Sequence, residues 1–128
     1  MAIWHTRSKR KRTSGKFRAN SKRKKAHIGG KFTETVLGEN EVVKERIRGG
    51  DTKNKVRSGN TINVCNPDSG ETEKVEIQDV LENPANSDFV RRDILTKGTI
   101  VDTEKGKVRI TSRPGQEGVL NGVKVSEE

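Results

Sequence analysis

The sequence is poor in the residues that form disulfides, bind metals or stack on nucleobases. It has one cysteine (Cys65), two histidines (His5 and His27), four aromatic rings and no tyrosine. A lone cysteine excludes an intramolecular disulfide, which indicates a cytosolic chain. One cysteine and two histidines do not supply a standard structural zinc site, so we expect no metal. The shortage of aromatic rings argues against sequence-specific recognition of single strands by stacking.

Long apolar runs and catalytic groupings are missing as well. No stretch approaches the ~18 consecutive apolar residues that span a bilayer, and no apolar segment follows the N-terminal charges as in a secretory signal. The sequence contains no GxxxxGK[ST] loop and no Ser/His/Asp or Cys/His grouping. Asp102 and Glu104 share one face of a predicted strand, but nothing indicates a pocket that would shift either pKa. We therefore expect no enzyme, no cofactor, no small-molecule substrate and no membrane partner.

Positive charge is abundant and lies at one end of the chain. Of the 27 Lys and Arg residues, 12 lie within residues 1–31, whereas the first carboxylate is Glu34. The rest of the chain holds 15 basic and 18 acidic residues, so it is slightly acidic. This division predicts a basic RNA-binding N-terminal extension over residues 1–31 and a body over residues 32–128. The basic residues of the extension are Arg7, Lys9, Arg10, Lys11, Arg12, Lys16, Arg18, Lys22, Arg23, Lys24, Lys25 and Lys31.

The N-terminal extension has too few apolar residues to fold alone, because little burial is available to offset the loss of conformational entropy. Its natural partner is a polyanion, since phosphates accept charge-assisted hydrogen bonds from Lys and Arg and release counterions on binding. Two other interpretations are a solvated tail that raises solubility and a nuclear-localisation signal built from the basic clusters at 7–12 and 22–25.

Short segments in the body alternate apolar and polar residues, which predicts strands joined by turns. The turn cluster at 66–70 and Lys105-Gly106 each predict a hairpin, and Asn86 or Ser87 is predicted to cap a short helix that ends near Asp93. The predicted strands comprise 33–37, 41–47, 61–65 with 73–77, the two arms of a hairpin within 98–112, and a last segment with Val119, Val123 and Val125 in strand spacing. Together they predict a mainly β fold: a small antiparallel β-barrel of about six strands with a basic, extended N-terminal arm and at most one short helix. Cys65 is then an inert strand residue.

The densest basic motif of the body is RIRGGDTKNKVRSGN, residues 46–60. Adjacent glycines let a backbone approach a phosphate closely, and flanking cations would hold the same nucleic-acid strand. An ordinary charged β-turn is the competing interpretation. The candidate binding residues are Arg48, Gly49, Gly50, Lys53, Lys55 and Arg57 here, with Arg46 beside them.

Three further arginines are weaker candidates for nucleic-acid binding. Arg91 and Arg92 follow the predicted helix, where Asp88 and Asp93 offer local ion pairs as the alternative. Arg113 lies in a Pro-Gly loop.

The last third of the chain, NPANSDFVRRDILTKGTIVDTEKGKVRITSRPGQEGVLNGVKV, closely resembles the archaeal and eukaryotic-type family of small-subunit ribosomal protein eight. The run TSRPGQEGVLN is the most specific part, followed by Asn-Pro-Ala-Asn at 83–86 with the paired arginines. The RGG run from Arg48 and the Trp-containing basic start extend the resemblance to essentially the whole chain, and the length is that of archaeal members.

The resemblance implies a β-barrel body and a basic extension that bind small-subunit ribosomal RNA, a structural role beside neighbouring ribosomal proteins, and a cytoplasmic location in the ribosome. The chain departs from the family pattern at Asp51, where Asn is usual, at Asp93, where Gly is frequent, and at His5-Thr6-Arg7 in place of an early Gly. Two rival functions are a ribosome-assembly factor with the same barrel and a DNA-binding architectural protein.

Overall fold

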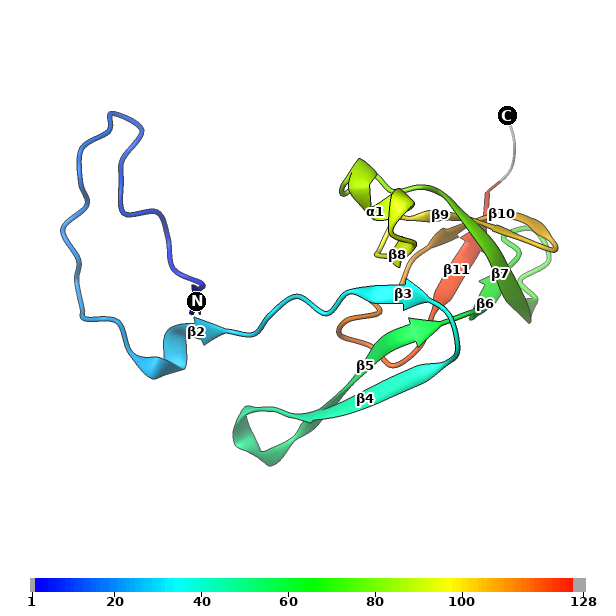
Figure 1. The fold of residues 1–128 in the computed structure, drawn as a ribbon, viewed down its shortest axis with the longest axis horizontal. Coiled ribbons are helices and arrows are strands. Elements are labelled where there is room, and N and C mark those ends of the chain that lie inside the picture. The colour runs from blue at the N-terminus through cyan, green and yellow to red at the C-terminus, as the bar shows by residue number, and fades with distance from the viewer. Residues whose placement is uncertain (1, 126–128) are drawn as a thin grey trace. The chain divides into compact units, whose positions relative to one another are not determined.

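The computed structural model describes residues 2–125 of the chain. The chain divides into two compact units, Met1–Phe32 and Thr33–Glu128, which are described separately (Figure 1). Within the described residues, no helix has the length and apolar character needed to cross a membrane.

The larger unit is built almost entirely from strands, as the alternating sequence pattern predicts. Between the strands lie the 3-10 helix η2 (Arg48–Gly50) and the α-helix α1 (Ser87–Arg91). The strands are β3 (Thr35–Leu37), β4 (Glu41–Arg46), β5 (Thr52–Gly59), β6 (Thr61–Cys65), β7 (Thr72–Glu82), β8 (Ile94–Leu95), β9 (Ile100–Thr103), β10 (Gly106–Ile110) and β11 (Asn121–Lys124).

The predicted small β-barrel is confirmed, with a different strand composition. Strands β10, β11, β6, β7 and β9 close the barrel in that order. All of their pairings are antiparallel except β11 with β6, which is parallel and places Asn121 opposite Asn63. The barrel therefore has five strands among the described residues, where the sequence predicted about six and antiparallel pairing throughout.

The barrel core follows the strand alternation. Ile62 and Val64 point inward from β6, and Val108 and Ile110 point inward from β10, all at most 2% exposed. Just before β11 the predicted pattern is displaced by one residue, because Val119 is 49% exposed while the neighbouring Leu120 is buried. The remaining buried members of the core are Val75, Ile77, Val80, Leu95 and Val101.

Gly122 of β11 lies where no side chain fits. A Cβ added there would lie 2.5 Å from Val108 Cγ1 and 2.9 Å from both Arg109 O and Ile62 Cδ1. Glycine at this position lets the backbone of β11 approach the core closely, which closes the barrel.

The other strands form a second sheet in the order β4-β5-β3-β8. The predicted strands at 33–37 and 41–47 exist, but they belong to this sheet rather than to the barrel. Strand β5 was not predicted, since residues 52–55 lack apolar alternation. The buried Thr35 hydroxyl donates a 2.6 Å hydrogen bond to Val56 O and ties β3 to β5. The β4–β5 hairpin projects away from the barrel strands (Figure 1).

Helix α1 forms where the capping pattern predicts it. The side chain of Asn86 accepts a hydrogen bond of 3.0 Å from the backbone N–H of Asp88, which satisfies one free donor of the first turn. The helix ends at Arg91, earlier than the predicted Asp93. Asp93 itself has φ 53°, in the left-handed region that glycine adopts most easily. The turn therefore keeps a glycine-type conformation although this chain has Asp there.

The smaller unit closes on itself through a short strand pair. Strand β1 (Ile3–Trp4) pairs antiparallel with β2 (Ile28–Gly29), and the 3-10 helix η1 (Lys25–His27) leads into β2. Between these ends the chain makes a long loop, within which Arg10 and Lys16 form an isolated antiparallel bridge. The sequence pattern did not predict this pairing, because each strand contributes only two residues.

Candidate nucleic-acid interface

The N-terminal unit presents all of its predicted binding cations to solvent. Each of the 12 Lys and Arg residues is exposed. The unit contains no acidic residue, so none of these charges is neutralised by a carboxylate within it. Unneutralised cations repel one another, which favours the binding of a polyanion.

Two aromatic rings position some of these cations. The guanidinium of Arg7 lies 3.8 Å from the centroid of the Phe17 ring, and the ammonium of Lys11 lies 5.8 Å from it. The guanidinium of Arg23 lies 5.1 Å from the centroid of the Trp4 ring. Such cation–π contacts contribute about 0.5–1 kcal/mol each at exposed sites, enough to bias side-chain orientation. In the sequence, the one sign of these contacts is that Trp4 and Phe17 are the only Phe, Trp or Tyr residues between positions 1 and 31.

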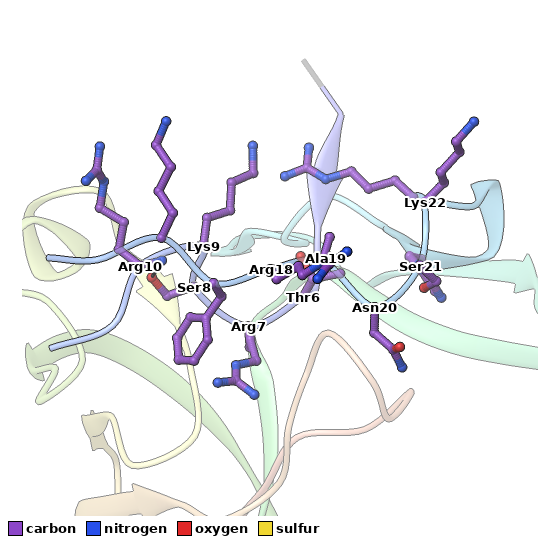
Figure 2. A pocket seen from close by; sticks show the side chains of 14 residues that line it. Thr6, Arg7, Ser8, Lys9, Arg10, Arg18, Ala19, Asn20, Ser21 and Lys22 are labelled. Atoms are coloured by element: carbon purple, nitrogen blue, oxygen red, sulfur yellow. Dashed lines mark hydrogen bonds between the residues drawn. The ribbon is translucent and has the colours of Figure 1, made fainter. Parts of the chain in front are cut away.

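A pocket of about 820 Å³ lies inside the loop of this unit, between the segments 6–10 and 16–23. Figure 2 shows Lys9, Arg10 and Lys22 pointing to one side of the loop, whereas Arg7 and Asn20 point to the other. The loop conformation thus separates cations that sequence proximity alone would place together.

The β4–β5 hairpin carries the basic motif of the body, and its two faces differ in charge balance. Lys53, Lys55 and Arg57 alternate along β5 and so share one face. On that face Lys55 forms an ion pair with Glu45, and only 18% of the Lys55 side chain is exposed. Arg57 lies 3.5 Å from the carboxylate of Glu41.

Lys53, the third predicted cation of this face, donates a 2.8 Å hydrogen bond to the side-chain oxygen of Gln116. Strand β5 therefore brings the three predicted cations together, but neighbouring acceptors already engage them. A phosphate would have to compete with these partners.

The opposite face of the hairpin carries two cations outside the set of predicted binding residues: Arg46, which lies in the basic motif, and Lys44, which precedes it and was missed. Lys44 lies opposite Asn54 and Arg46 lies opposite Thr52, and both side chains are exposed. Neither forms a salt bridge with a described acidic residue. Their cross-strand neighbours are not acidic, and the sequence could not show this before the register of β4 and β5 was known.

The Gly-Gly pair forms the tip of this hairpin, as the turn interpretation predicts. Gly49 and Gly50 have φ values of 88° and 85°, which residues other than glycine rarely adopt. A Cβ at either position would have no neighbour within 4 Å, so the tip is open to a ligand. The turn is closed by a 2.8 Å hydrogen bond from Ile47 N–H to Asp51 O, and Arg48 is exposed within it.

The three weaker candidates lie elsewhere on the larger unit. Arg92 forms an ion pair of 2.5 Å with Glu34 rather than with the local Asp88 or Asp93. Arg91 is exposed at the end of α1. The carbonyl of the exposed Arg113 accepts hydrogen bonds from the backbone N–H groups of residues 116 and 117, which holds it in a turn.

Across residues 2–125 no group of three His, Cys, Asp or Glu side chains lies close enough to hold a metal ion. Cys65 is the last residue of β6, partly buried, with its Sγ 3.8 Å from the carbonyl of Asn66.

Comparison with known proteins identifies the family of this chain. The model of the family described as ribosomal protein S8e matches residues 4–125. A small ribosomal subunit protein eS8 from Methanosphaera stadtmanae is 48% identical over 124 residues, which cover 96% of this chain and 98% of the relative. A protein of the same name from Methanocella arvoryzae is 44% identical over 119 residues, covering 93% and 95% respectively. The homologue from Nanoarchaeum equitans is 50% identical over 102 residues, which is 80% of each chain. The chain belongs to the ribosomal protein S8e family.

Proposed function

We propose that this chain is a structural constituent of the small ribosomal subunit, where it binds and stabilises small-subunit ribosomal RNA and so supports translation. Its partners are that RNA and the neighbouring ribosomal proteins, and its location is the ribosome in the cytoplasm. The proposal includes no catalytic step and no cofactor. The names of its relatives, small ribosomal subunit protein eS8, support this placement.

The observation that carries the proposal is the segregation of charge. The exposed cations of the N-terminal unit have no carboxylate among them, whereas several cations of the larger unit are paired with glutamates. A surface of this kind gains free energy when phosphates replace condensed counterions. The N-terminal extension therefore supplies the main contact to RNA.

The β4–β5 hairpin supplies a second, smaller contact. Its tip offers two open glycines, and the backbone N–H groups beside them are suitable donors to a phosphate. Lys44 and Arg46 are the hairpin cations best placed to neutralise phosphates, because no glutamate among residues 2–125 forms a salt bridge with them, whereas glutamates pair with Lys55 and Arg57.

Incorporation into subunits tests the proposal. Tagged full-length protein is expressed in an archaeal host, and mature small subunits and their precursors are separated on gradients after a high-salt wash. We expect the chain in mature subunits at the level of other ribosomal proteins. Its presence in precursors alone would favour an assembly factor. Equal affinity for duplex DNA and folded ribosomal RNA would favour an architectural DNA-binding protein.

A further inference from the structure

The pocket inside the N-terminal unit has a size and lining that a simple electrostatic surface would not need. Its volume of about 820 Å³ lies within the range of pockets that enclose small organic ligands, roughly 300–1,000 Å³. Its walls combine cationic side chains with the Phe17 ring, Ala19 and the methylene groups of Lys and Arg. A mixed lining of this kind suits a ligand with a charged part and a flat apolar part.

The stacked pair of Arg7 and Phe17 forms the flat element of this lining. The guanidinium carbon lies over the Phe17 ring, 3.8 Å from its centroid, so the ring contacts the guanidinium from one side. Arg7 is exposed, which leaves the guanidinium accessible to a further planar group. Unstacked nucleobases bind to aromatic rings and to guanidinium planes in this way.

Three cationic side chains lie on the other side of the same loop. Lys9, Arg10 and Lys22 point away from the side to which Arg7 points (Figure 2). A nucleotide has the same polarity, with a phosphate at one end and a planar base at the other.

We propose that this pocket takes one unstacked nucleotide of RNA, with its base against the Arg7–Phe17 pair and its flanking phosphates against Lys9, Arg10 and Lys22. The inference rests on the proposed function and goes further, because it names the form of RNA that the N-terminal unit recognises. A continuous duplex would reach the outer cations but would leave the pocket unused. Stacking on the Arg7–Phe17 pair favours a bulged nucleotide over a paired one. It gives little preference among the four bases, because every base has a flat face that can stack.

The experiment compares two RNA hairpins that differ by a single bulged nucleotide, a fluorescent 2-aminopurine. Full-length wild-type protein should bind the bulged hairpin at least about fivefold more tightly and should quench the 2-aminopurine, since stacking on one platform gives a gain of this order. Arg7→Lys keeps the charge and removes the planar group, so it should abolish the preference and the quenching. Arg109→Lys, the same change at an exposed position of the barrel, is the matched control.

A second pair of variants tests the ring. Phe17→Leu should also abolish the preference, whereas Phe32→Leu, at an exposed phenylalanine outside the pocket lining, should keep it. Circular dichroism checks that each variant has the wild-type spectrum.

The outcomes separate this inference from the proposed function. Equal, salt-dependent binding of both hairpins by the wild type would overturn the pocket proposal and leave RNA binding intact. Retention of the preference in Arg7→Lys would overturn it as well. Binding of neither hairpin would overturn the proposed function and the pocket proposal together.

Discussion

Removal of the N-terminal unit should change the salt dependence of RNA binding far more than it changes the fold. The truncated chain begins at Thr33 and keeps every strand of the barrel and of the second sheet. It loses 12 exposed cations that no carboxylate of their own unit neutralises. If about half of these reach phosphates, the N-terminal unit contributes about −5 to the log–log salt slope, from roughly −0.9 per neutralised phosphate, and the full-length slope is this contribution plus that of the larger unit.

The slope expected for the truncated chain follows from the pairing of the remaining cations. Lys55, Arg57 and Arg92 already interact with glutamates, which lowers their net gain from a phosphate. Lys44 and Arg46 have no such partner among the described residues. About two neutralised phosphates remain, which gives a slope of roughly −2.

The assay is a titration of small-subunit RNA fragments with full-length and truncated protein at several salt concentrations. Circular dichroism and thermal unfolding establish that the truncated chain is a folded β-protein. A folded truncated chain with the full-length slope would refute the reasoning, since the main contact would then lie on the larger unit. Loss of the β-spectrum on truncation would refute the independence of the barrel.

Three substitutions, two of them with a matched control variant, test the larger unit. Gly122→Ala should lower the free energy of unfolding by about 2–3 kcal/mol in urea, because the added methyl group overlaps the core and a backbone oxygen; an unchanged midpoint would contradict the close approach of β11. Gly50→Val should weaken RNA binding by about tenfold, because one charge-assisted hydrogen bond between the backbone and a phosphate is lost. Gly70→Val is the control, since Gly70 also has a positive φ and no neighbour within 4 Å of an added Cβ, and this variant should bind as the wild type does. Arg46→Gln should flatten the salt slope by about 0.9, and Arg57→Gln should leave it nearly unchanged; equal effects would show that the glutamate pairing is irrelevant.

The parts of the fold that follow from local alternation were predictable from the sequence. Ile62 and Val64 alternate with polar residues, and so do Val108 and Ile110, and both segments form barrel strands with these residues inside. Strand β5 escaped prediction because its first half is exposed on both faces, so burial imposes no alternation there. The parallel pairing of β6 with β11 depends on contacts between residues far apart in the sequence, which no local pattern encodes.

The candidate interface was predictable in composition but not in arrangement. The cluster of cations at the N-terminus is visible in the sequence, and so is the glycine tip. The pairing of Lys55 with Glu45 depends on the register of two strands, and the stacking of Arg7 on Phe17 depends on how the loop closes. Both arise from tertiary geometry, and for this reason they became visible only in the structure.

The position of β11 in the chain sets the order in which the molecule is completed during synthesis. This strand follows all other described strands, yet it pairs with both β10 and β6 to close the barrel. A chain that emerges N-terminal end first therefore exposes its cations to surrounding nucleic acid before the barrel can form. Until β11 is made, β6 and β10 each keep an open edge that another chain can pair with. The nascent protein thus needs protection at two places, from stray polyanions at its basic segment and from edge-to-edge association at its unfinished barrel.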